Sequence, residues 1–110
     1  MSDFAAIAPS VFQPTAGQVY AELAGELAIL NSRTGIYYGL DPVGARVWSL
    51  ILGFRSMTEI RDTLLDEYDV QVSQVEADLT NLILDLKAKG LIENAPPGAR
   101  ERALAEAHGE

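Results

Sequence analysis

The hydrophobic pattern of this chain changes its period once, at Asp41-Pro42, and that change limits the fold more than any other feature. Before this point apolar and polar residues alternate in short segments, as in β-strands, and after it apolar residues recur at helical spacing. Aspartate followed by proline is typical of a helix start, because the carboxylate can cap the helix and proline needs no backbone donor there. The sequence therefore predicts strands followed by helices, within one domain of 110 residues.

Three strands are predicted before the change of period. Alternation over residues 19–23 indicates the first, the apolar run 27–30 the second, and the aromatic segment 36–40 the third. The connectors at residues 24–25 and 31–35 are short and rich in turn-forming residues. We therefore expect an antiparallel meander with the first and third strands at its two edges.

Two helices are predicted next. The first ends at Gly53. The second begins at a capping box of Ser56 and Glu59, in which each side chain bonds the free backbone N–H of the other. Its apolar stripe is Ile60, Leu64 and Tyr68.

A third helix is predicted to begin at a similar box formed by Ser73 and Glu76. It should end at Gly90 in a Schellman closure, where Leu91 folds back on Leu86. The order is then β-β-β-α-α-α, an α+β fold that resembles a winged helix-turn-helix.

Composition divides the chain into three parts. Prolines and glycine in residues 1–17 predict a flexible N-terminal arm, and residues 18–93 form the folded domain. Paired prolines open a charged tail over residues 94–110, which we expect to be disordered or a short frayed helix.

The sequence offers no constellation for catalysis or metal binding. There is no cysteine, and the one histidine, His108, lies in the tail. Neither a phosphate-binding loop nor a base beside a serine is present. The chain also lacks a signal peptide and an apolar segment of membrane-spanning length. These observations predict a cytoplasmic protein that is not an enzyme and needs no cofactor.

The charge of the chain argues against nucleic acid as its partner. The formal net charge is −8. A DNA-reading helix offers basic or amide side chains at its front, whereas the third predicted helix begins with Gln74, Glu76 and Asp78. A DNA-binding winged helix is therefore the weaker alternative to a peptide-binding module on the same scaffold.

The third predicted strand has the properties of a peptide-binding edge. Residues 36–40 contain no proline and no charge to protect an open edge, and they include two tyrosines. An added peptide strand can pair with such an edge through its backbone. The alternatives, that the N-terminal arm or a second copy of the chain covers this edge, stay open.

Three segments together resemble the PqqD-like family: residues 26–31, residues 34–41 and residues 43–48, with Gly44-Ala45-Arg46 and Trp48 in the last. Tyr68-Asp69-Val70 and the end of the third helix add to the match, which spans about residues 18–93. The resemblance implies a winged-helix recognition element for ribosomally made, modified peptides.

The resemblance also implies a binding mode, in which the leader of a precursor peptide adds to the third strand and the third helix forms the other wall. Because neighbouring residues of a strand point to opposite faces, only one of the two tyrosines can face this groove. Mapped onto this chain, the peptide-binding residues are Ile36, Tyr37, Tyr38, Gly39, Leu40, Val75, Asp78, Leu79 and Leu82.

Within the family, residues 34–41 look most like the standalone recognition proteins of lasso-peptide pathways. This branch implies a precursor leader and a separate leader peptidase as partners, and we expect the chain to be a monomer. The alternative is the pyrroloquinoline-quinone branch, in which the adaptor serves a radical enzyme.

Overall fold

The computed structural model describes residues 3–108, and the side chains of Leu23, Ala107 and His108 lie outside that description. The fold is mixed α+β, with a three-stranded antiparallel sheet as predicted. In chain order its elements are η1 (Asp3–Ala6), β1 (Phe12–Pro14), β2 (Gln18–Leu23), β3 (Glu26–Asn31), β4 (Tyr37–Leu40), α1 (Pro42–Leu52), α2 (Met57–Glu67), α3 (Val72–Ala88), β5 (Ile92–Asn94) and α4 (Ala99–His108). The predicted order lacked β1, β5 and α4.

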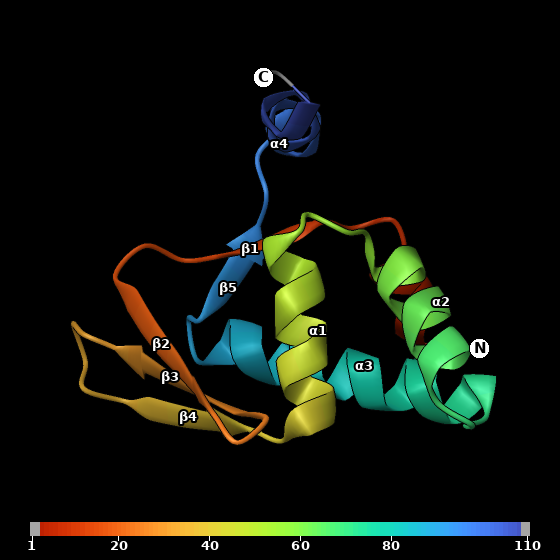
Figure 1. Cartoon of the computed structure of the whole chain (residues 1–110), viewed down its shortest axis with the longest axis horizontal. Coiled ribbons are helices and arrows are strands. Elements are labelled where there is room, and N and C mark those ends of the chain that lie inside the picture. The colour runs from red at the N-terminus through yellow and green to blue at the C-terminus, as the bar shows by residue number, and fades with distance from the viewer. Residues whose placement is uncertain (1–2, 109–110) are drawn as a thin grey trace.

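The larger sheet has the order β2-β3-β4, so β2 and β4 are its edges. Leu27 and Ile29 on β3 and Leu40 on β4 are buried, because this face of the sheet packs on α1. Figure 1 shows α1 in the middle of the molecule, between this sheet and α2. Its residues Trp48 and Ile51 are almost fully buried and join the sheet to the helices in one core.

Both predicted starts of α1 and α2 are confirmed. Asp41 accepts a hydrogen bond from the Gly44 backbone N–H, 2.8 Å, with proline at the first position of α1. At α2, Ser56 and Glu59 form the reciprocal capping box. Each box or cap satisfies backbone donors that a helix start leaves free.

The two ends of α3 differ in how well they were predicted. The helix starts at Val72 with Gln71 as its N-cap and no capping side chain, so the predicted box of Ser73 and Glu76 is wrong. At the other end the Schellman closure is confirmed. The Leu91 backbone N–H donates to the Leu86 carbonyl, 2.9 Å, and Gly90 has a positive φ of 71°.

The structure corrects the expectation of a loose N-terminal arm. Phe4 and Phe12 are buried, and the Thr58 backbone N–H donates to the Ala8 carbonyl at 3.0 Å. β1 pairs antiparallel with β5 in a second, two-stranded sheet, with Phe12 opposite Asn94. Two aromatic anchors therefore hold residues 3–14 against the helices.

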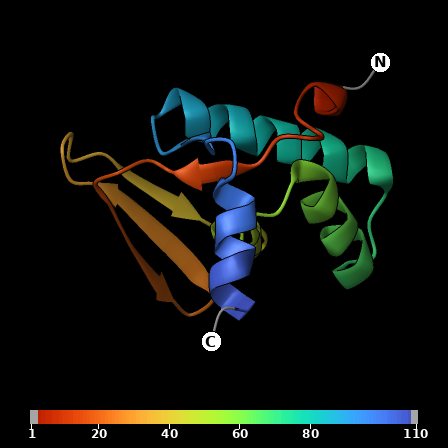
Figure 2. The same ribbon diagram turned by 90° about the horizontal axis from the view of Figure 1, so that it is seen from above.

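The tail, for which disorder or a short frayed helix was expected, contains a helix of 10 residues. α4 follows the paired prolines, and Ala99 at its start is buried. Arg100 donates to the Glu59 carboxylate at 2.7 Å, which joins α4 to α2. Figure 1 shows α4 standing above the body, away from β4. Figure 2, in which the molecule is seen from above, shows α4 lengthwise.

Within residues 3–108 no helix combines the length and the apolar character needed to cross a membrane.

Candidate functional site

The free edge of β4 is the first part of the site. The Asn31 backbone N–H donates to the Ile36 carbonyl at 2.9 Å, at the point where β3 and β4 begin to pair. Because bonded and non-bonded pairs alternate in an antiparallel ladder, Tyr38 bonds back to β3 in the same way. Tyr37 and Gly39 then direct their N–H and C=O groups outward, away from the sheet.

The two tyrosines of β4 face opposite sides of the sheet. Tyr38 is half-buried and its hydroxyl donates to the Asp85 carboxylate on α3, 2.5 Å. Tyr37 is 67% exposed and lies on the other side, over Gly39. Tyr38 is therefore the tyrosine that faces α3, which the alternation of the strand left undecided.

A small ionic cluster holds Tyr38 to α3. Lys89 donates to Asp85 at 2.7 Å, and its ammonium lies 5.3 Å from the centre of the Tyr38 ring. The hydrogen bond to Asp85, followed by burial, raises the pKa of Tyr38 to about 12. The hydrogen bonds from Lys89 and then from Tyr38 lower the pKa of Asp85. Both shifts favour the protonated tyrosine and the ionised aspartate that the contact requires.

A hollow of about 520 Å³ lies between β4 and α3. A second, mostly apolar hollow of about 190 Å³ continues between α1 and α3. Val43, Asp78 and Leu82 line both, so the two hollows meet, and together they are called the groove below. The first hollow is lined by Tyr38, Gly39, Leu40, Asp41, Val43, Gly44, Asp78 and Leu82.

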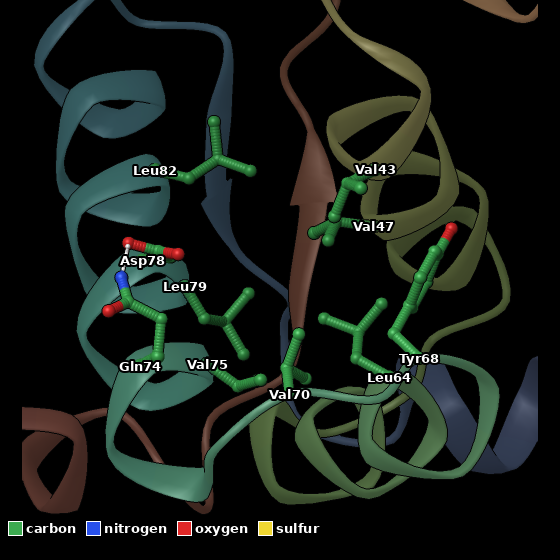
Figure 3. Close-up of a pocket in the computed structure, with 10 residues that line it drawn as sticks. All are labelled: Val43, Val47, Leu64, Tyr68, Val70, Gln74, Val75, Asp78, Leu79 and Leu82. Carbon is green, nitrogen blue, oxygen red and sulfur yellow. Dashed lines mark hydrogen bonds between the residues drawn. The ribbon is translucent and has the colours of Figure 1, made fainter.

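Figure 3 shows how the apolar part of the groove is built. Side chains of α1, the end of α2 and the connector before α3 face α3 across it. On the α3 wall the Gln74 amide donates to Asp78, 2.9 Å, which is the one hydrogen bond drawn there. The lining residues are Val43, Val47, Leu64, Tyr68, Val70, Gln74, Val75, Asp78, Leu79 and Leu82.

The structure brings seven of the nine predicted binding residues to the groove: Tyr38, Gly39, Leu40, Val75, Asp78, Leu79 and Leu82. Ile36 and Tyr37 do not line it. Ile36 is half exposed and precedes β4, and Tyr37 lies over the opposite face of the sheet. Val75 and Leu79 are also core residues, because both are nearly buried.

Several groove residues were missed by the sequence-based prediction. They come from the N-cap and first half of α1, from α2 and the connector that follows it, and from the first turn of α3. Tyr68 had been assigned only to the apolar stripe of its helix, although 38% of it is exposed. The missed residues are Asp41, Val43, Gly44, Val47, Leu64, Tyr68, Val70 and Gln74.

No group of histidine, cysteine or carboxylate side chains suited to a metal ion occurs among the described residues. The side chain of His108 is not among them.

Comparison with known proteins identifies the family. The family model described as coenzyme PQQ synthesis protein D (PqqD) matches residues 26–92, which is more than half of the chain. The chain therefore belongs to the PqqD family, as its sequence motifs indicated. A search of curated proteins finds no match.

Two solved structures share the fold. One is TbiB1 in complex with the TbiA(beta) leader peptide, with a TM-score of 0.71 and 36% identity, covering 76% of this chain and 98% of that one. The other is a lasso peptide synthetase B1 complexed with the leader peptide, with a TM-score of 0.71 and 24% identity, covering 76% and 99%. The second structure, at 24% identity, supports a shared fold and nothing further.

Proposed function

We propose that this protein is a non-catalytic recognition element that binds the leader of a ribosomally made precursor peptide in lasso-peptide biosynthesis. In this role it presents the bound precursor to a separate leader peptidase. The observation that carries the proposal is the edge of β4 beside the groove along α3, with which no other strand of residues 3–108 pairs. Support also comes from the 36% identical TbiB1, whose structure contains a leader peptide.

The proposed binding mode is strand addition. The outward N–H and C=O groups of Tyr37 and Gly39 supply backbone hydrogen bonds, and every second peptide side chain enters the groove towards Leu82. The three-stranded sheet and α1–α3 then act as a winged helix-turn-helix whose third helix, α3, faces a peptide instead of DNA. Peptide-facing residues in this mode are the seven predicted residues that line the groove, together with the backbone of Tyr37.

The second candidate is an adaptor for a radical enzyme in pyrroloquinoline-quinone biosynthesis, which the name of the matching family favours. The two roles use the same groove and differ in the precursor and the enzyme served. Genes beside this one distinguish them: a leader peptidase and an asparagine-synthetase-like cyclase favour the lasso pathway, and a radical enzyme the other.

The proposal is tested with the test leader, a synthetic peptide of the leader part of the precursor encoded beside this gene. Calorimetric titration of the full chain should show saturable one-to-one binding, with no binding of a scrambled peptide or of duplex DNA at physiological salt. Mass spectrometry should show an unchanged precursor until the peptidase is added. Absence of binding, or cleavage by this chain alone, would refute the proposed role.

A further inference from the structure

Three side chains close the groove at one end: Tyr38 of β4, Asp85 of α3 and Lys89, the residue that follows α3. This set is called the end wall below. Tyr38 donates to Asp85 at 2.5 Å, Lys89 donates to the same carboxylate at 2.7 Å, and the ammonium lies over the tyrosine ring. Tyr38 lines the first hollow, whereas Asp85 and Lys89 line neither hollow. Those two side chains, 42% and 41% exposed, therefore contact the tyrosine from outside the two hollows.

The position of the end wall follows from the spacing of residues along α3. Asp78, Leu82, Asp85 and Lys89 follow one another at intervals of three or four, which places them in a row on one helix face. The first two line the hollow beside β4, and the next two hold Tyr38. The groove thus continues from Leu82 towards the apolar hollow and stops at Tyr38 in the other direction.

Strand addition alone does not fix the register in which a peptide binds. The backbone hydrogen bonds of a peptide strand do not depend on its side chains. A peptide that slips by two residues therefore makes the same number of bonds, and alternate side chains still point into the groove. Pairing with Tyr37 and Gly39 alone cannot select one register. Selection requires a side chain that accepts some peptide residues and excludes others at a fixed point along the edge.

We infer that the end wall sets the register in which a peptide strand binds β4, and that the Tyr38 ring limits the size of the peptide side chain beside it. The inference rests on the proposed function. Since the Tyr38 hydroxyl already donates to Asp85, the residue acts on the peptide through the shape of its ring. Asp85 and Lys89 are positioning residues, because they restrict the rotation of that ring.

The experiment places a single tryptophan at each position of the test leader and titrates every peptide against the parent protein and the Tyr38→Ala variant. At one position on the groove side, tryptophan should weaken binding to the parent by about tenfold or more. Tyr38→Ala should recover most of that loss, because the smaller side chain leaves room for the indole. Tyr38→Phe, which keeps the ring but frees it from Asp85, should recover only part.

Tyr37→Ala is the matched control, since it removes a tyrosine from the same strand on the face away from the groove. It should rescue no tryptophan peptide. Thermal melting checks that each variant is folded, and Tyr38→Leu replaces Tyr38→Ala if the latter is not. Failure of every peptide to recover, or equal recovery with Tyr37→Ala, overturns the register inference while leaving leader binding intact. If the unmodified test leader does not bind the parent, the proposed function itself fails.

Discussion

The rings of Tyr20 on β2 and Trp48 on α1 meet edge to face, with centroids 5.8 Å apart and an interplanar angle of 71°. Trp48 is 2% exposed, whereas Tyr20 is 45% exposed. The pair therefore attaches an outer strand of the sheet to the central helix, in the geometry that aromatic quadrupoles favour.

This pair should be measurable by a double-mutant cycle. We expect Tyr20→Leu and Trp48→Phe to show a coupling of about 0.5–1.5 kcal/mol in the free energy of unfolding, the usual range for such aromatic contacts. Trp48→Phe leaves no broken hydrogen bond, because the buried indole Nε1 has no partner among the described residues. Tyr20→Leu with Val47→Ala, which lacks the ring contact, is the comparison cycle. Equal coupling in both cycles would contradict an aromatic contribution.

The Tyr38–Asp85 contact predicts a pH dependence of stability. The hydrogen bonds that Lys89 and then Tyr38 donate lower the pKa of Asp85 in the folded state. These contacts therefore stabilise the fold above the ordinary aspartate pKa of about 3.9 and lose that effect as the pH falls through the lowered value. The parent should therefore exceed Asp85→Asn in stability at neutral pH, and the difference should shrink in acid. Denaturant unfolding from pH 7 downwards measures this difference, with Asp66→Asn, at an exposed position of α2, as a charge-matched control.

The same contact predicts that Tyr38 ionises at a higher pH than an ordinary tyrosine. Tyr38 should ionise near pH 12 in the parent, and Asp85→Asn should bring its pKa back towards 10. Ultraviolet absorbance of tyrosinate follows the titration, and subtraction of the Tyr38→Phe curve isolates the residue. An unchanged Tyr38 titration in Asp85→Asn would show that the hydrogen bond does not persist in solution.

Proline substitutions distinguish the backbone N–H groups of β4 that bond to β3 from those that point outward. The Tyr38 N–H pairs with β3, so Tyr38→Pro should disrupt the fold, whereas Tyr37→Pro removes an outward N–H and should stay folded. Tyr37→Pro should weaken test-leader binding by about 1–3 kcal/mol, the cost of an unmade buried hydrogen bond. Tyr37→Ala retains the N–H and serves as the control, so the difference between the two variants reports on the backbone bond. Equal affinities would show that the peptide does not pair at this point.

The tail should be dispensable for binding. Deletion of residues 97–110 removes α4 and the Arg100–Glu59 ion pair, which lie on the side of the body away from β4. We expect the affinity for the test leader to change by less than about 1.4 kcal/mol, or tenfold. A larger loss in the titration would place α4 in contact with the peptide.

A substitution at Phe12 tests whether the N-terminal segment is packed against the helices. The Phe12 side chain is 1% exposed, so Phe12→Ala should cost about 3–5 kcal/mol in the free energy of unfolding through lost burial and a cavity. Phe54→Ala, at a half-buried position after α1, is a milder comparison. A loose arm would instead make Phe12→Ala nearly neutral in denaturant unfolding.

The parts of this fold that the sequence predicted are those encoded by neighbouring residues. The cap at Asp41, the box of Ser56 and Glu59 and the closure at Gly90 each depend on a few adjacent positions. The pairing of β1 with β5 has no such local signal, because each strand is three residues long and its partner lies at the other end of the chain. The prolines of β1 and of the segment before α4 also favoured irregular structure locally.

The groove was predicted only in part for a similar reason. Alternation along residues 36–40 requires the two tyrosines to face opposite ways, but the choice between them depends on where α3 packs. The helical period likewise assigned Tyr68 to an apolar face without showing that this face continues beyond its helix into the groove. The orientation of the tyrosines and the place of Tyr68 in the groove both depend on tertiary packing.

The pairing of Phe12 with Asn94 has a consequence for how the chain is made. During synthesis β2, β3 and β4 emerge in succession and can pair with immediate neighbours, whereas β1 waits for β5, which follows α3. Closing so long a loop carries an entropic cost that the small sheet must offset together with the burial of Phe12. A chain interrupted before residue 92 would already contain every groove residue, yet Phe12 would still lack its partner strand.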